Sequence, residues 1–197
     1  AKSLGIPKKS SMYTIINIPY DQNSPFNGIL RYLSTDRVSN TKLKLNQLLE
    51  LKSGKPEQNS DRTVYNLIDY TNSNETFYAS KSESKQNWII FHFINSSVDL
   101  EGYEITSYCS GKNCYHPKTF EIQGSNDNSE WDRLDRRENC SGLNDKSRSV
   151  FFECNSPTHK FYKYIRFYQI EHWRSGANDP FTIRLSRFEL YGKWRHQ

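Results

Sequence analysis

Residues Ile183 to Gly192 read IRLSRFELYG, and residues Tyr164 to Phe167 read YIRF. Apolar and polar residues alternate in both stretches, which is typical of β-strands with one buried face. Further upstream, Phe120 to Trp131 read FEIQGSNDNSEW, where an alternating strand runs into a turn rich in Gly, Asn and Asp. The C-terminal half of the chain is therefore expected to consist of strands joined by polar turns.

Similar patterns occur towards the N-terminus. Strands are predicted at residues 13–18, 88–93, 98–108, 150–154 and 161–170. Residues 28–33 have the spacing of a short helix, residues 42–51 fit a strand or a short helix, and residues 63–69 fit a short strand or a turn. No long helix interrupts the series, so the sequence predicts an all-β, antiparallel two-sheet sandwich with one or two short N-terminal helices.

The order of these motifs resembles the F5/8 type C, or discoidin-like, domain. A strand, the GSND turn with Trp131, the YIRF strand and the LSRFELYG strand follow one another as in that family. Residues Gln86 to Phe93 (QNWIIFHF) are similar to the central strand of the family, although His92 stands where Asp is common. Residues Gly102 to Ser107 are similar to the next strand. The resemblance implies an eight-stranded jelly-roll of the galactose-binding-domain type.

The resemblance covers residues 64–192, and Gly28 to Leu33 matches an element that precedes the domain in intracellular protist members. A chain of 197 residues fits one domain with a sizeable core. We expect residues 1–11 to form a flexible arm. Residues 12–197 are expected to form a single discoidin-like domain, with residues 12–60 as its N-terminal extension.

Composition limits the classes of partner. Charged residues make up 25% of the chain and the net charge is +5, but the basic residues are spread out and do not cluster with aromatic residues. Nucleic-acid binding is therefore not expected. No apolar run approaches the roughly 20 residues of a membrane-spanning helix, so membrane insertion is not expected either. The loops are mostly polar, which disfavours binding to lipid headgroups.

Four cysteines, too few for a disulfide scaffold, occur in the chain: Cys109, Cys114, Cys140 and Cys154. Secreted members of the resembling family often join their two ends by a disulfide, and here neither end has a cysteine. This favours a cytoplasmic location, with a secreted or cell-surface location as the alternative. The first residue is Ala1 and not Met, which suggests a piece of a longer parent.

Residues Cys109, Cys114 and His116 have a spacing that superficially suggests metal ligands. Structural zinc sites usually need four ligands in two close pairs, and a second pair is missing. We therefore expect neither a metal nor another cofactor. The two thiols of this loop are either free or joined in a small local disulfide.

The resemblance places ligands at one end of the barrel, between loops. Three loops should meet there, at residues 71–86, 108–116 and 171–180. The candidate ligand-binding residues are Trp173, Arg174, His172, Asn178, Tyr115, His116, Lys112 and Asn113. Trp173 can stack on a sugar ring or a side chain, and Arg174 can hold a carboxylate or a hydroxyl. Alternatively, Trp173 only covers the end of the barrel, Arg174 is solvated, and His116 only shapes the turn.

Other conspicuous residues are assigned no binding role. Four are expected in the core (Trp88, Trp131, Phe188 and Leu190), and Arg166 and Arg187 are expected as partly buried partners of acidic groups.

No motif of a known enzyme class occurs in the chain. The sequence therefore predicts a non-catalytic recognition module that binds a partner protein or peptide, as part of a larger adaptor or scaffold protein. The alternative is a lectin-like, carbohydrate-binding module that uses the same loops.

Overall fold

The computed structural model describes residues 12–34, 45–54, 63–70, 77–80, 87–176 and 181–196. The expected flexible arm, residues 1–11, lies outside the described residues. The first of two antiparallel sheets has the order β1 (Thr14–Ile18), β10 (Arg184–His196), β5 (Ser96–Ser107) and β8 (Ser149–Glu153), and the short β3 (Tyr78–Ala79) also pairs with β10. The second sheet has the order β2 (Leu49–Ser53), β4 (Trp88–Phe93), β9 (Tyr164–His172), β6 (Pro117–Ser125) and β7 (Asp132–Arg137).

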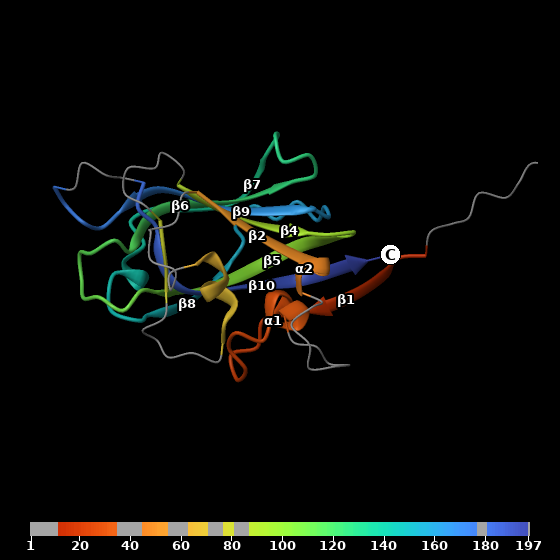
Figure 1. Ribbon diagram of the computed structural model, residues 1–197, viewed down its shortest axis with the longest axis horizontal. Helices are drawn as coiled ribbons and strands as arrows, with labels where there is room; N and C mark the ends of the chain where they lie inside the picture. Colours follow the sequence, from red (N-terminus) through yellow and green to blue (C-terminus); the bar gives the residue numbers. More distant parts are fainter. Residues whose placement is uncertain are drawn as a thin grey trace, which may run out of the picture.

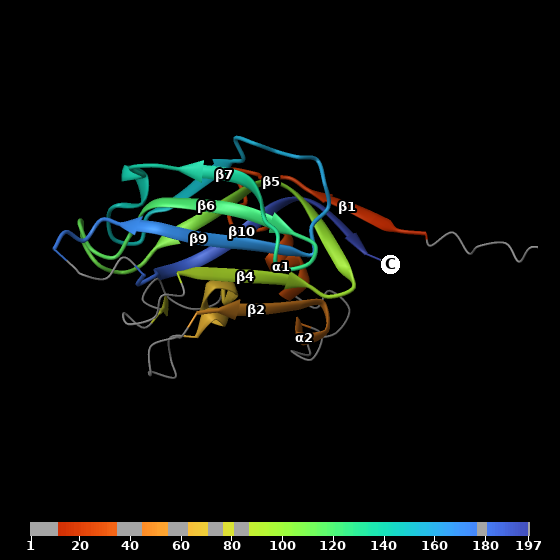
Figure 2. The ribbon, with the colours of Figure 1, turned by 90° about the horizontal axis from the view of Figure 1, so that it is seen from above.

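The two sheets form two layers (Figure 1), and Figure 2 looks down on the second sheet with its strands side by side. Short helices are α1 (Ile29–Ser34) and α2 (Leu45–Leu48), with 3-10 turns at Val64–Ile68 and Ser141–Leu143. The predicted all-β sandwich with short N-terminal helices is confirmed. The described residues form ten strands, two more than the eight implied by the resemblance.

The core lies between the inner faces of the sheets. Phe91 of β4 and Phe167 of β9 are fully buried, and their rings lie 5.0 Å and 5.9 Å from the ring of Phe188 on β10. Leu190, two residues further along β10, is also fully buried. These side chains alternate with outward-facing ones, because successive strand residues point to opposite faces. The prediction that Phe188 and Leu190 belong to the core is confirmed.

The core prediction is wrong for two tryptophans. Trp88 is half-buried because it shares the outer face of β4 with His92, while Ile89 and Phe91 point inward. Trp131 is also half-buried, and its ring lies 3.9 Å from the guanidinium carbon of Arg166. Both indoles therefore lie on the outside of the second sheet, and that of Trp131 covers Arg166.

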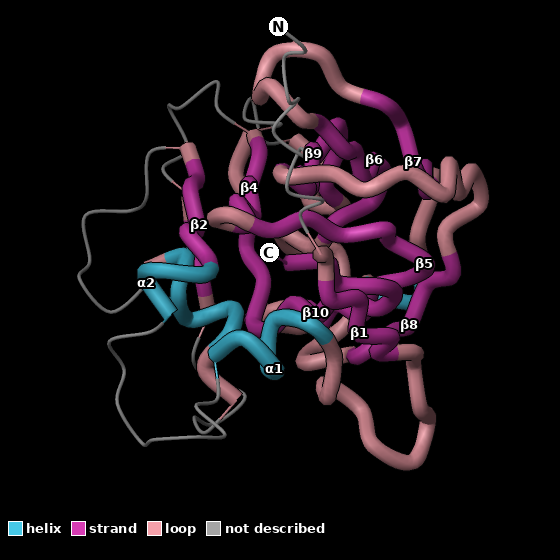
Figure 3. The backbone as a smooth tube through the Cα atoms, turned by 90° about the vertical axis from the view of Figure 1, so that its right-hand side faces the viewer, coloured by secondary structure: helices cyan, strands magenta, loops and turns pink. Residues whose placement is uncertain are grey.

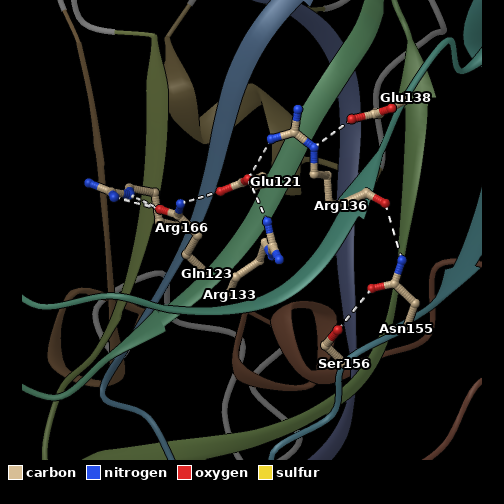
Figure 4. A network of polar contacts seen from close by, with 8 residues as sticks. All are labelled: Glu121, Gln123, Arg133, Arg136, Glu138, Asn155, Ser156 and Arg166. Carbon is tan, nitrogen blue, oxygen red and sulfur yellow. Dashed lines mark hydrogen bonds and ion pairs between the residues drawn. The ribbon is translucent and has the colours of Figure 1, made fainter.

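Figure 4 shows a polar network on this outer face, carried by β6, β7 and β9. Glu121 accepts hydrogen bonds from Arg136 (2.8 Å) and Gln123 (2.7 Å), and Arg133 lies 3.6 Å away. Although partial burial opposes it, hydrogen bonding from Arg136 and Gln123 lowers the pKa of Glu121. The Nε of Arg166 donates to Gln123 Oε1 at 2.8 Å, so the direct partner of Arg166 is an amide and not the expected acidic group.

A buried carboxylate joins the N-terminal segment to the first sheet. Glu189 of β10 is fully buried and accepts the backbone N–H groups of Leu30 (2.7 Å), Arg31 (3.1 Å) and Leu190 (2.8 Å). It also accepts the hydroxyl of Tyr70 at 2.9 Å. Burial raises the pKa of Glu189 to about 7, even though these donors oppose the rise. The first turn of α1 therefore lies directly on the outer face of β10.

A second acidic residue binds the same N-terminal segment. Glu104 of β5 is 3% exposed and accepts the N–H of Phe26 at 3.0 Å and the hydroxyl of Tyr191 at 2.8 Å. Tyr20 stacks on Phe151 of β8 with ring centroids 3.7 Å apart. The described part of the N-terminal segment thus covers the outer face of the first sheet. We propose that it belongs to the same domain as the rest of the chain.

Candidate functional site

Strand pairing brings two of the three expected loops together at one end of the sandwich. Pro117, the first residue of β6, pairs with His172, the last residue of β9. The loop before β6 and the loop after β9 therefore leave the second sheet side by side, on the left in Figure 1. Of the third loop, residues 71–86, only residues 77–80 lie within the described part, where Tyr78 and Ala79 pair with β10.

Tyr115 is the centre of a cluster at this end. The guanidinium carbons of Arg174 and Arg184 lie 4.7 Å and 4.4 Å from its ring centroid. His172 contacts the same ring edge-on, at 5.1 Å between centroids and 76° between planes. Cation–π attraction holds both guanidinium groups against the aromatic ring. The structure therefore brings three of the predicted residues, Tyr115, His172 and Arg174, into direct contact.

Trp173 lies beside this cluster and is held at both ends. Its backbone N–H donates to the carbonyl of His116 (3.0 Å), and its indole Nε1 donates to the carbonyl of Cys140 (3.2 Å). The ammonium of Lys118 lies 5.4 Å from the centroid of the indole ring and pairs with Glu171 at 2.7 Å. The half-buried indole is thus fixed in orientation, with a cation over its ring.

The two predicted histidines are buried. His116 is fully buried, and its Nε2 lies 3.0 Å from the carbonyl of Ser110 and 2.9 Å from that of Gly111. Because carbonyl oxygens only accept hydrogen bonds, Nε2 must carry a proton. Burial lowers the pKa of His116, which favours the neutral ring. His172 is 5% exposed. Both rings are placed to shape the loops, and a ligand-contacting role for them stays a prediction.

Lys112 and Asn113 lie exposed at the tip of the loop before β6. The backbone N–H of Asn113 donates to Asn144 Oδ1 (2.8 Å), and Asn144 Nδ2 donates back to Asn113 Oδ1 (2.9 Å). This exchange ties the loop to the one between β7 and β8, where Cys140 also lies. Asn113 has a φ of 57°, a conformation that Asn tolerates better than most residues. Asn178 lies outside the described residues.

None of the four cysteines forms a disulfide. Cys114 lies within the loop end, with its Sγ 3.3 Å from Ser110 Oγ. Hydrogen bonding from Ser110 lowers the pKa of Cys114 against the effect of burial, and the positive charges of Arg174 and Arg184 add to the lowering. Cys154 belongs to the core, and burial raises its pKa to about 12.

Several residues of this end are not marked by a motif in the sequence. Arg184 looks like an ordinary strand residue, yet it is the first residue of β10 and therefore lies at the loop end. Lys118 and the loop that carries Cys140 and Asn144 are not marked by any motif. The signal that could have found them is positional: neighbouring antiparallel strands begin and end at this edge, so their terminal residues share it.

The loop end is positively charged. In the described residues of the loops before β6 and after β9, with the strand ends beside them, the basic side chains are Lys112, Lys118, Arg174 and Arg184, and the one acidic side chain, Glu171, is paired with Lys118. Within the part of the chain that the structure describes, no carboxylate lies within 4.0 Å of the exposed guanidinium of Arg174. Such a surface attracts negatively charged groups.

Comparison with protein families matches the F5/8 type C domain over residues 51–184. The chain belongs to the F5/8 type C domain family. Domains of this family are recognition modules, and this accounts for a rigid sandwich whose loops are elaborated at one end. A comparison with curated proteins gives no significant match.

Among solved structures, this F5/8 type C domain is similar to CBM32-3 from a family 31 glycoside hydrolase of Clostridium perfringens, with a TM-score of 0.55 and 17% identity over 73% of this chain and 90% of that one. CBM32-1 of the same kind of enzyme gives a TM-score of 0.53 with 13% identity, over 74% of this chain and 96% of that one. The CBM32-5 module of CpGH89, from the same organism, was solved with GalNAc-β-1,3-galactose and gives a TM-score of 0.52 with 13% identity, over 73% and 93%.

A family 89 glycoside hydrolase from Clostridium perfringens, solved in complex with PUGNAc, also matches, with a TM-score of 0.51 and 14% identity. The match covers 74% of this chain but only 14% of the length of that enzyme. At identities of 13–17%, these structural matches show a shared fold. In the described part of the chain, no helix has the length and apolar character needed to cross a membrane.

Proposed function

We propose that this F5/8 type C domain recognises an acidic segment of a partner polypeptide through its loop end. The observation that carries the proposal is the clamp of Arg174 and Arg184 on the ring of Tyr115, with centroid distances of 4.7 Å and 4.4 Å. Guanidinium groups bind carboxylates through paired N–H donors. Two of them fixed on one ring present several donors to an acidic side chain.

Preorganisation strengthens this interpretation. An arginine that binds a ligand normally loses side-chain freedom, which reduces affinity by about 0.5–1.5 kcal/mol per side chain. Here Tyr115 already restrains both arginines, and His172 supports Tyr115 from its edge. The backbone bond between Trp173 and His116 locks the two loops together. The two arginines are therefore already ordered before a ligand binds, and less side-chain entropy is lost on binding.

The biological setting is part of the same proposal. We propose that the domain acts within a larger adaptor or scaffold protein in the cytoplasm. The lack of a disulfide among the four cysteines fits a reducing compartment. A domain that recognises acidic segments would then bring its parent protein to a partner.

Fluorescence anisotropy with labelled Asp/Glu-rich peptides tests the proposal. An acidic peptide should bind, its Asn/Gln counterpart should not, and the affinity should fall as salt is raised. Arg174→Gln should weaken binding at least roughly tenfold, since a charged hydrogen bond contributes about 1.5–3 kcal/mol. Arg133→Gln is the matched control, because Arg133 is exposed on the outer sheet face. Equal binding of the acidic and amide peptides would refute the proposal.

A second candidate is carbohydrate binding. The similar CBM32-5 module was solved with GalNAc-β-1,3-galactose, and half-buried Trp173 and Tyr115 offer the aromatic rings on which sugars stack. The cations over both rings make this the weaker candidate, because they occupy positions near the faces that a sugar would use. A glycan array without signal, or sugar affinity unchanged by Trp173→Ala, would exclude it.

A further inference from the structure

A cavity of about 250 Å³ lies at the end of the sandwich opposite the loop end. Figure 3 looks onto this end, where the C-terminal part of β10 lies beside β1. The cavity is lined by Tyr13, Asn95, Ser96, Ser97, Lys163 and Arg195. These residues come from the position before β1, the turn between β4 and β5, the start of β5, the position before β9 and the end of β10. Most of the lining groups are cationic, hydroxyl or amide groups.

Arg195 is held in place by two aromatic rings. Its guanidinium carbon lies 4.2 Å from the ring centroid of Phe161 and 4.9 Å from that of Tyr13. Its Nε donates to Ser97 Oγ at 3.3 Å. Neither Arg195 nor Lys163 has a carboxylate within 4.0 Å among the residues that the structure describes. Two cations therefore line one cavity, and neither has an acidic partner in the described part of the chain.

The backbone around the cavity is fixed. The N–H of Lys163 donates to Asn126 Oδ1 (3.0 Å), and its carbonyl accepts the N–H of Phe93 (2.8 Å). Tyr162 and Val98 exchange backbone hydrogen bonds of 2.8 Å and 2.9 Å. The position from which Lys163 extends is thus set by the sheet and by the turn after β6.

Ser96 lies at the wall of the same cavity. It is 6% exposed, and its Oγ has no hydrogen-bond partner in the described structure. Ser97 and Asn95 add further polar groups to the same wall.

We propose that this cavity binds a phosphate monoester. A monoester carries a charge of about −1.5 to −2 at neutral pH and three acceptor oxygens. Lys163 and Arg195 supply two positive charges, and Ser97 and Asn95 supply hydrogen-bond donors. The volume leaves room for part of the group that carries the phosphate. The site is separate from the loop end, so the domain can engage a phosphorylated ligand and an acidic segment at once.

Isothermal titration of the whole chain tests the proposal with three probes: inorganic phosphate, glucose 6-phosphate and a phosphoserine peptide with neutral flanks. Binding of the peptide but not of the sugar phosphate points to a phosphorylated protein as the source, and the reverse points to a small metabolite. Binding should weaken below about pH 6, where the phosphate gains a proton.

Arg195→Gln and Lys163→Gln should each weaken binding at least roughly tenfold. Lys163 is exposed, so its variant should fold normally even if Arg195→Gln does not. Arg133→Gln, on the outer face of the second sheet, is the control and should leave phosphate binding unchanged. The proposal is overturned if no probe binds at millimolar concentration. It is also overturned if binding survives in Lys163→Gln.

Discussion

Replacing the buried Glu189 by glutamine should change how the stability of this domain depends on pH. In the folded protein, Glu189 is surrounded by protein and its pKa is raised from 4.5 to about 7, chiefly because burial disfavours the charged carboxylate. The folded state therefore binds the proton more tightly than the unfolded state does. The stabilising effect of this proton is complete below about pH 4.5 and is lost as the pH rises to about 7.

The size of the effect follows from the two pKa values. Each pH unit between them corresponds to about 1.4 kcal/mol, so the rise from 4.5 to about 7 corresponds to roughly 3 kcal/mol. The wild-type protein should lose this amount of unfolding free energy from Glu189 between about pH 4 and about pH 8. The amide of the Glu189→Gln variant does not titrate, so the variant should not show this loss.

Urea unfolding followed by tryptophan fluorescence measures the difference. Glu189→Gln loses one carboxylate oxygen, so it should be less stable at low pH, where the Arg31 N–H and the Tyr70 hydroxyl meet an amide group instead. The difference in unfolding free energy between the wild type and Glu189→Gln should then narrow by roughly 3 kcal/mol as the pH rises. Other titrating groups are common to both proteins and cancel in the comparison.

Glu138→Gln provides the control, because the Glu138 side chain is exposed on the outer face of the second sheet. Its stability gap from the wild type should stay nearly constant with pH. The reasoning is refuted if the difference in unfolding free energy between the wild type and Glu189→Gln widens with rising pH. That result would mean that the four donors outweigh burial and that the carboxylate is charged in the folded state.

Two further predictions concern a glycine and a thiol. Gly28→Ala should destabilise the fold by about 1–3 kcal/mol in the same unfolding assay, because a Cβ at this position would collide with the backbone oxygen of Leu190. Gly111→Ala is the control and should have little effect, because a Cβ there meets nothing within 4 Å. Equal effects of the two substitutions would contradict the packing of Gly28 against β10. Cys114, with its lowered pKa, should react with iodoacetamide near neutral pH before Cys154, whose pKa is about 12. Mass spectrometry identifies the modified residue, and prior modification of Cys154 would count against the assigned environments.

The sequence predicts the strands whose apolar residues alternate, and it fails where alternation is absent or misleading. Strand β7, Asp132–Arg137, reads DRLDRR and has one apolar residue, Leu134, because Arg133 and Arg136 serve the outer polar network and the buried Asp135 accepts the Tyr103 hydroxyl. Its pairing with β6 becomes visible only in the folded sheet. A lone apolar residue gives no periodic signal.

Glu189 shows the opposite failure. By alternation it faces away from Phe188 and Leu190, which predicts exposure to solvent, yet it is fully buried. The reason is that α1, more than 150 residues earlier in the chain, covers that face of the sheet. A period of two distinguishes the two faces of a strand but does not show what packs on each.

The candidate site is predictable in its location but less so in its contacts. The loops that the sequence places at one end do carry Tyr115 and Arg174 into contact. The second arginine of the clamp, Arg184, and the carbonyl of Cys140 that holds Trp173 depend on three-dimensional neighbours far apart in sequence. Pairwise geometry of this kind has no local sequence signal.

Hydrogen–deuterium exchange of the whole chain, with and without a saturating acidic peptide, tests most directly whether the loop end is the recognition surface. Protection should appear in the loop before β6 and around His172 to Gly176. It should be absent from the outer sheet face around Glu121. Protection confined to that face, or to the opposite end around Arg195, would contradict the account.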